Sequence, residues 1–392
     1  MRSRLKKFII FILILALSNI FTIFADIDVN SDIRAAVSGD FETGEILYSY
    51  NIEEVVEIAS ITKLMTYLVA KEALENNEIS SDDLVIVSQN AASTKGSSFG
   101  LTAGEEIKFR LLLDVILIVS GNDAAVAVAE HVSGSEEEFV ERMNKKAEEI
   151  GITTARFINP NGMPIDLEET DQNYMSTGDL FKLARYIIEK YPEITDTTDI
   201  EKLVIPERNY EKEATNPLLT EIDAVDGLKT GYTDKAGLCL ISTAPVVVEE
   251  DNNKNRRVIS IIMGARSHMD RIQKSIDLLE YGMYEYGKEK IVSKDEMIDT
   301  IVIPNAVEMT LEVQPEKDYY RLVKKDSEIK EELNYQNYDN TAPVNKGDLV
   351  GELDVYIEGE YVDTIKIVAS RDVEKAGFFT RAFRYLRGIF YN

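Results

Sequence analysis

Apolar side chains recur with the period of an α-helix in several stretches of the chain. In the first stretch Ile61, Leu64, Met65 and Leu68 follow the i, i+3, i+4, i+7 spacing of one helix face. Shorter apolar runs between polar turns predict β-strands. The predicted helices cover 61–74, 109–119, 124–132, 136–150, 177–191 and 269–286, and the predicted strands cover 33–38, 46–48, 84–87, 203–205, 238–248 and 258–264. One strand pair comes early and the remaining strands come late. We therefore predict an α/β fold in which one antiparallel sheet is sandwiched by helices.

The pattern changes at both ends of this region. From Thr300 to Val368 short β-like runs alternate with polar loops, which predicts a small C-terminal all-β domain over 295–370. Residues 1–25 begin with four cations, continue through an apolar run and end in small and mixed residues. That is the pattern of a secretory signal peptide, so we expect an exported protein with its main domain over 26–290.

The terminal segment, residues 371–392, is basic and amphipathic. In a helical projection Phe379, Phe383 and Leu386 share one face, while Arg381 and Arg384 lie on the other side. A basic amphipathic helix at the end of an acidic protein is typical of an interfacial anchor. We expect it to attach the protein peripherally to the outer face of the cytoplasmic membrane. A helix packed back on the β-domain is the alternative.

Composition narrows the classes of function. The 392 residues carry a formal net charge of −27, which argues against a nucleic-acid partner. The single cysteine, Cys239, excludes an intramolecular disulfide and is expected in a buried strand. With only two histidines beside it, the chain cannot build a Cys/His zinc site of the usual spacing, so no metal site is predicted.

The first candidate for catalysis is the pair Ser60 and Lys63. Ser60 stands where the helix over 61–74 should begin, and Lys63 follows one turn later on the same face. An amine there can take the proton of the hydroxyl, while the helix N-terminus favours negative charge nearby. A serine cap beside a solvated lysine has the same spacing, and Ser-x-x-Lys also occurs at 3–6 and 327–330.

The second candidate is the polar turn Ser120-Gly121-Asn122-Asp123, which links two apolar helices. Buried side chains of Ser120 and Asn122 would need hydrogen-bond partners, which makes them candidates for a site. Capping of the second helix by Asn122 or Asp123 is an equally good interpretation.

The third candidate is Lys229-Thr230-Gly231, which leads into the strand over 238–248. An amine and a hydroxyl along an edge strand could dock a carboxylate, and the glycine would let a substrate backbone approach closely. An ordinary glycine turn with a solvated lysine is the alternative.

In this order the three motifs resemble those of the penicillin-recognising serine enzymes, specifically the low-molecular-mass penicillin-binding proteins that are D-alanyl-D-alanine carboxypeptidases. The resemblance covers about residues 30–290, and the C-terminal parts resemble the same enzymes by arrangement. Ile58 departs from the proline usual two residues before the nucleophile, and a histidine usual ahead of Ser176 is replaced within 172–175. The similar segments are 43–47, 60–66, 120–125, 159–162, 216–219 and 226–233.

The resemblance implies a role for each residue of the motifs. Ser60 attacks the carbonyl of the penultimate D-alanine, Lys63 is the base, and Ser120 relays a proton to the leaving D-alanine. Asn122 orients Lys63 and binds the substrate amide. The substrate-binding residues are Lys229, Thr230, Gly231 and Tyr232.

The resemblance also implies the partners and the environment of the site. The terminal carboxylate docks on Lys229 and Thr230, and the backbone N–H groups of Ser60 and Tyr232 form the oxyanion hole. The substrate is a peptidoglycan stem peptide ending in D-Ala-D-Ala, β-lactams are inhibitors, and no cofactor is needed. Burial and the charge of Lys229 would lower the pKa of Lys63.

Two alternatives keep the three motifs. A β-lactamase would need a deacylating carboxylate between the second and third motifs, and Glu168-Glu169-Thr170-Asp171 does not match that pattern. A non-hydrolytic protein that binds penicillin or peptidoglycan would keep the fold without turnover.

Overall fold

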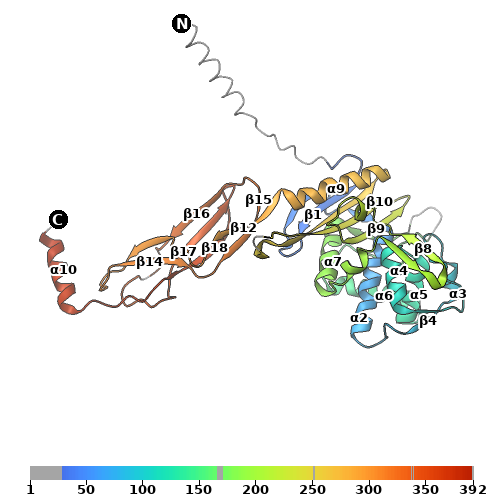
Figure 1. Cartoon of the computed structure of the whole chain (residues 1–392), viewed down its shortest axis with the longest axis horizontal. Helices are drawn as coiled ribbons and strands as arrows, with labels where there is room; N and C mark the ends of the chain where they lie inside the picture. Colours follow the sequence, from blue (N-terminus) through green and yellow to red (C-terminus); the bar gives the residue numbers. More distant parts are fainter. Residues whose placement is uncertain (1–28, 166–170, 250–251, 337, 339, 391–392) are drawn as a thin grey trace, which may run out of the picture.

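The structure is a computed structural model that describes residues 29–165, 171–249, 252–336, 338 and 340–390, with side chains of the last helix described as far as residue 384. The predicted signal peptide over 1–25 lies outside these residues, as do Glu168 to Thr170. Two folded parts follow one another along the chain, and a terminal helix lies beyond them (Figure 1).

A five-stranded antiparallel sheet organises the first part. The strand order is β2-β1-β11-β10-β9, so β9, which carries Lys229, lies at an edge as predicted. Cys239 is fully buried in β10. The bounds are β1 Ala35–Asp40, β2 Ile46–Tyr50, β9 Gly227–Thr233, β10 Gly237–Val246 and β11 Arg256–Ala265.

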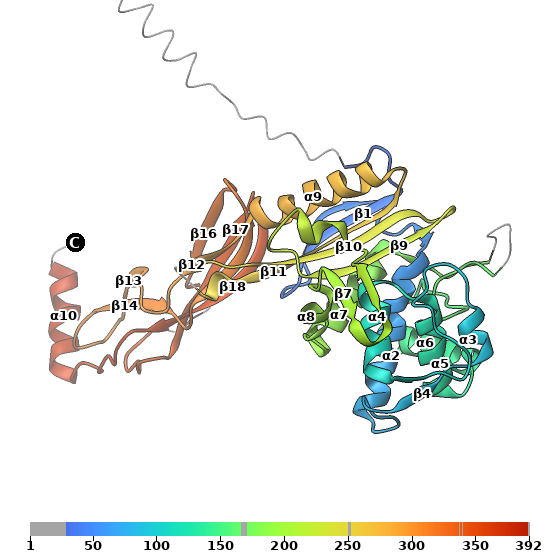
Figure 2. The same cartoon turned by 45° about the vertical axis from the view of Figure 1, so that its right-hand side comes forward.

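Helices cover both faces of this sheet, which confirms the predicted architecture. Successive strand residues point to opposite faces. Val37 packs into the large core formed with α2 (Lys63–Glu75) and α7 (Thr177–Lys190), whereas Ala36 packs with Leu278 of α9 (His268–Tyr284). In Figures 1 and 2, α9 lies along one face of the sheet and the other helices gather against the opposite face.

The remaining elements of this part complete the helical layer and three small strand pairs. α3 is a short helix that forms because Ser88 caps its first turn by accepting a hydrogen bond from the N–H of Ala91. The helices are α3 Gln89–Ser93, α4 Phe109–Ile118, α5 Asn122–Ser133, α6 Glu136–Glu149 and α8 Ile194–Thr198. The strand pairs are β3 Val55–Glu57 with β6 Tyr174–Ser176, β4 Leu84–Ile86 with β5 Glu106–Lys108, and β7 Lys202–Ile205 with β8 Tyr210–Glu213.

The prediction that Ser60 caps a helix is wrong. Ser60 lies inside a 3-10 turn, η1 (Ala59–Thr62), and α2 begins only at Lys63. No side chain caps either element; instead the hydroxyl of Ser60 lies 2.8 Å from the amine of Lys63. Ala59, the residue before it, has a φ of +46°, which directs the chain sharply into this turn.

The C-terminal all-β domain begins slightly earlier than predicted. Its first strand, β12, starts at residue 286 and pairs with β15, so the preceding helix ends at Tyr284. The larger sheet has the order β13-β14-β18-β17-β16 and its own apolar core, which includes Val313, Val355 and Ile367. The bounds are β12 Tyr286–Val292, β13 Asp299–Val302, β14 Thr310–Pro315, β15 Tyr319–Lys324, β16 Ile329–Asn334, β17 Leu349–Ile357 and β18 Glu360–Ala369.

The terminal helix is shorter than the predicted segment over 371–392. α10 spans Phe378–Phe390, and the residues before it follow the β-domain, with an isolated bridge between Ala306 and Lys375. α10 lies at the end of the molecule remote from the first sheet (Figures 1 and 2). Among the helices of the described residues, none is both long and apolar enough to cross a bilayer.

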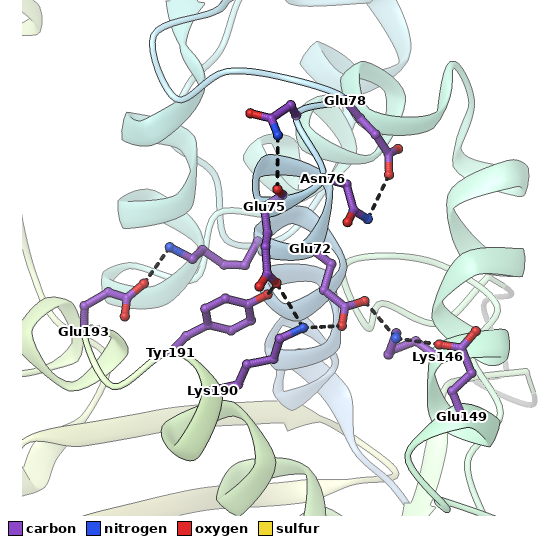
Figure 3. Close-up of polar contacts among 11 residues, drawn as sticks. Glu72, Glu75, Asn76, Glu78, Lys146, Glu149, Lys190, Tyr191 and Glu193 are labelled. Atoms are coloured by element: carbon purple, nitrogen blue, oxygen red, sulfur yellow. Dashed lines mark hydrogen bonds and ion pairs between the residues drawn. The ribbon is translucent and has the colours of Figure 1, made fainter.

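A cluster of charged residues fixes the C-terminal end of α2. Glu72 lies 2.9 Å from the amine of Lys146 on α6 and 2.9 Å from that of Lys190 on α7 (Figure 3). Lys190 also contacts Glu75, which accepts a hydrogen bond from the hydroxyl of Tyr191. The cluster therefore ties α2 to two neighbouring helices, at the opposite end of α2 from Lys63.

Candidate active site

The amine of Lys63 is the centre of the site. This side chain is fully buried, and its Nζ lies 2.8 Å from Oγ of Ser60, 2.7 Å from Oδ1 of Asn122 and 2.6 Å from the carbonyl oxygen of Asn161. Burial lowers its pKa well below the usual value, and the charge of Lys229 lowers it further, while Asp123 acts in the opposite direction. Both causes that the sequence predicted for a depressed pKa are present.

Asn122 is held in one orientation. α4 ends at Ile118, and Ser120, with a φ of +61°, turns the chain so that α5 begins at Asn122. The side-chain Nδ2 of Asn122 donates to the carbonyl of Lys95 at 2.7 Å, so its Oδ1 faces Lys63. Neither Asn122 nor Asp123 is the cap of α5, whose N-cap is Gly121. Of the two interpretations of this turn, the structure therefore favours the site.

Asp123 has a supporting function that the sequence did not reveal. Its buried carboxylate accepts hydrogen bonds from the backbone N–H groups of Phe99, Gly100 and Leu101 and from the hydroxyl of Ser98. These bonds fix the loop that carries Lys95 and therefore the acceptor that orients Asn122. Nothing in the sequence pattern around Asp123 indicated that it anchors this loop.

The edge strand β9 closes the site on the opposite side. A side chain on Gly231 would place its Cβ 3.0 Å from the carbonyl oxygen of Ile58 and 3.2 Å from Cβ of Ala59, so glycine lets β9 approach the turn that carries Ser60. Lys229 is 1% exposed, and burial together with the charge of Arg271 lowers its pKa to about 7. Its Nζ donates to the carbonyl of Thr230 at 3.1 Å.

Between these elements lies a cleft of about 770 Å³. Of the eight residues predicted for the site, Ser60, Ser120, Asn122, Thr230, Gly231 and Tyr232 line it. Lys63 and Lys229 are buried behind its walls. The structure thus brings all three motifs to one cleft, with the side chain of Tyr232 exposed at its mouth.

Arg271 is a residue of the cleft that the sequence analysis missed. It lies in the first turns of α9 and lines the cleft, although only 8% of it is exposed. Its Nε has no hydrogen-bond partner among the described residues, and burial lowers the pKa of its guanidinium. A buried cation with an unused donor is suited to an anionic ligand. In the sequence it was one cation among several on a predicted amphipathic helix, with no motif around it.

Comparisons with known proteins agree with this geometry. A family model described as D-alanyl-D-alanine carboxypeptidase matches residues 24–267, and one described as penicillin-binding protein 5, C-terminal domain, matches residues 286–375. The D-alanyl-D-alanine carboxypeptidase DacF of Bacillus subtilis is 34% identical over 354 residues, which cover 88% of this chain and 87% of that relative.

Solved structures show the same similarity. The D-alanyl-D-alanine carboxypeptidase DacD from Francisella tularensis has a TM-score of 0.68 at 28% identity, covering 88% of this chain and 94% of that one. Penicillin-binding protein D2 from Listeria monocytogenes, in its cefotaxime-bound form, has a TM-score of 0.57 at 32% identity, covering 64% of this chain and 97% of that one.

The fold and the cleft therefore define a serine-type peptidase with the architecture of a low-molecular-mass penicillin-binding protein. More particularly, the chain belongs to the D-alanyl-D-alanine carboxypeptidase family, which confirms the resemblance seen in the sequence.

Proposed function

We propose that the protein is exported and removes the terminal D-alanine from peptidoglycan stem peptides through an ester on Ser60. The arrangement around Lys63 carries this proposal. A neutral amine has two N–H groups and one lone pair, and the oxygens of Asn122 and Asn161 can only accept hydrogen bonds. The two N–H groups are therefore used there, and the lone pair faces the hydroxyl of Ser60.

The reaction proceeds in two steps. Lys63 takes the hydroxyl proton of Ser60 as Oγ bonds to the carbonyl carbon of the penultimate D-alanine. The C–N bond then breaks, the terminal D-alanine leaves with a proton relayed through Ser120, and the acyl group stays on Ser60. Water hydrolyses this ester, returning the proton to Ser60. The backbone N–H groups of Ser60 and Tyr232 stabilise the oxyanion in both steps.

The terminal carboxylate is held at the β9 side of the cleft. Lys229, Thr230 and Arg271 place two cations and a hydroxyl there. A carboxylate brought close to Lys229 raises its pKa and restores its charge, which gives a charge-assisted hydrogen bond in a buried setting. We therefore expect a preference for peptides that end in a free acid.

β-Lactams are proposed inhibitors, because a β-lactam carbonyl can acylate Ser60 and its carboxylate can use the same cations. The cefotaxime-bound form of the Listeria monocytogenes relative supports this assignment. The volume of the cleft and the exposed side chain of Tyr232 at its edge leave room for the bulky acyl side chain of a β-lactam.

We further propose that α10 attaches the protein peripherally to the outer face of the cytoplasmic membrane. Phe378, Phe379 and Phe383 are 71%, 86% and 67% exposed. Arg384 donates to the carbonyls of Ala306 and Val307, which joins the helix to the β-domain and leaves these aromatic rings uncovered. Exposed rings beside cations suit the interface of an anionic bilayer.

The test is D-alanine release from a pentapeptide that ends in D-Ala-D-Ala, with the wild type, Ser60→Ala and the exposed control Ser93→Ala. We expect release by the wild type and the control and none by Ser60→Ala. Equal release by all three would contradict the proposal. Fast turnover of penicillin without release would favour a β-lactamase, and a stable penicillin adduct without release would favour a non-hydrolytic binding protein.

A further inference from the structure

One of the three oxygens around the amine of Lys63 does not come from a helix or from the 3-10 turn. The carbonyl of Asn161, which lies 2.6 Å from Nζ, belongs to an irregular segment between α6 and β6. Loops outside regular structure are usually the most mobile parts of a fold. The orientation of the lone pair of Lys63 therefore depends on whatever fixes this segment.

The side chain of Asn173 holds the segment on one side. Asn173 is fully buried, and its Oδ1 accepts a hydrogen bond from the N–H of Ile158 at 2.7 Å. Its Nδ2 donates to the carbonyl of Asn159 at 2.9 Å and to Oγ1 of Thr62 at 2.9 Å. Thr62 is the residue before Lys63, so one amide joins the segment to the start of α2.

A second side chain holds the segment from α2 itself. Thr66, also fully buried, lies one turn after Lys63 and donates its hydroxyl to the carbonyl of Pro160 at 2.6 Å. The residue after Asn161 packs closely against the turn that carries Ser60, because a Cβ on Gly162 would overlap the carbonyl oxygen of Ala59. The carbonyl of Asn161 is thus fixed by bonds to residues 158, 159 and 160 and by contact at residue 162.

We propose that Asn173 and Thr66 are positioning residues for the base, an inference that rests on the proposed function. They keep the carbonyl of Asn161 on Lys63, so that both N–H groups of the neutral amine are occupied and its lone pair points at Ser60. Without this acceptor the amine can rotate and present an N–H group to Oγ, and the hydroxyl proton then has no base. Both residues are fully buried, and neither lines the cleft.

The effect should be on the chemical step and not on binding. We would measure acylation of the full chain by a fluorescent penicillin over a range of concentrations, which separates the acylation rate constant from the dissociation constant of the preceding complex. For Asn173→Ala we expect the rate constant to fall about tenfold or more, with the dissociation constant changed less than about twofold. The final stoichiometry should remain one label per chain, whereas partial unfolding would reduce it.

Two further variants make the test independent of folding. Thr66→Val has nearly the same shape and removes only the hydroxyl, so it should slow acylation in the same selective way even if Asn173→Ala does not fold. Asn144→Ala is the matched control, because Asn144 bonds to the N–H and carbonyl of Phe157 and contacts neither Asn161 nor Lys63. We expect it to acylate at the wild-type rate.

The outcomes separate the two proposals. Wild-type acylation rates in folded Asn173→Ala and Thr66→Val would overturn the positioning role and leave the proposed function intact. Equal losses in Asn144→Ala would also overturn it, since the effect would then be general. Failure of the wild type itself to release D-alanine or to be acylated at Ser60 would instead contradict the proposed function.

Discussion

Replacement of Lys229 by methionine should stabilise the folded protein while it impairs the enzyme. The amine of Lys229 is buried, and burial and the charge of Arg271 lower its pKa to about 7. In the unfolded chain a lysine titrates near 10.4. Between these two values the unfolded state binds a proton that the folded state lacks, so this residue lowers the free energy of unfolding.

The size of the effect follows from the difference in pKa. A gap of about 3.5 units corresponds to roughly 4–5 kcal/mol at low pH, and about 4 kcal/mol remains near pH 7, where the folded amine is half protonated. The penalty is complete below pH 7 and disappears as the pH rises through about 10.4. Methionine has a similar volume and no charge, so Lys229→Met should regain up to about 4 kcal/mol at pH 7 and almost nothing at pH 10.5.

Urea denaturation followed by far-UV circular dichroism, at pH 7 and again near pH 10.5, measures this difference. Lys145→Met is the matched control, because the side chain of Lys145 is 77% exposed and should show no pH-dependent gain. The same Lys229→Met protein should lose about 10- to 100-fold in kcat/KM for a peptide with a free terminal carboxylate, which is the value of one charge-assisted hydrogen bond. A variant that is no more stable than the wild type at pH 7, or whose gain persists unchanged at pH 10.5, would refute the reasoning.

Three further outcomes follow from contacts elsewhere in the molecule. Glu72→Gln should lower the free energy of unfolding by only about 1 kcal/mol, because Lys146 and Lys190 each keep a second carboxylate. The loss, measured by urea denaturation, should shrink in 1 M NaCl. A loss that does not depend on salt would instead indicate a packing effect. Gly162→Ala should slow acylation at least about tenfold and destabilise the fold, since Gly162 has a φ of +84° and a Cβ there would overlap the carbonyl oxygen of Ala59. Calorimetry measures the stability and penicillin labelling measures the acylation rate. Labelling at the wild-type rate would contradict this prediction. Phe379→Ser with Phe383→Ser should reduce binding to vesicles rich in phosphatidylglycerol without changing D-alanine release in solution, and unchanged sedimentation with the vesicles would exclude these rings as the anchor.

Much of the fold could be predicted from the sequence because its elements are strongly periodic. The helices over 136–150 and 177–191 were found within one or two residues, since each has an apolar stripe and a serine cap. The predicted start of α2 was too early because a serine before an apolar stripe normally caps a helix. Ser60 instead lies in a 3-10 turn, with its hydroxyl 2.8 Å from the amine of Lys63. At this position the contact between Ser60 and Lys63 outweighs the local preference of serine for a helix cap.

The residues of the site divide in the same way. Ser60, Lys63 and Asn122 lie in short motifs with recognisable spacing, so they could be named before their positions were known. Asp123 and Asn173 act through hydrogen bonds to distant segments, and Arg271 reaches the cleft from a helix far along the chain. The sequence pattern around each is that of an ordinary polar or charged residue. The spacing of residues in a sequence shows which side chains lie close together on one helix or strand. It does not show which side chain from a distant segment will hold a loop by hydrogen bonds.

The two buried amines of this site have opposite requirements, and the geometry meets each separately. In the proposed mechanism Lys63 acts as a base, and burial together with the charge of Lys229 lowers its pKa, which favours that role. Lys229 has a pKa of about 7, and a bound carboxylate would raise that pKa and so favour its charged form. The stability lost by burying both amines is therefore the cost of the proposed site. The ion pairs of Glu72 lie at the other end of α2 from Lys63. They can therefore offset part of the lost stability without contacting the residues of the site.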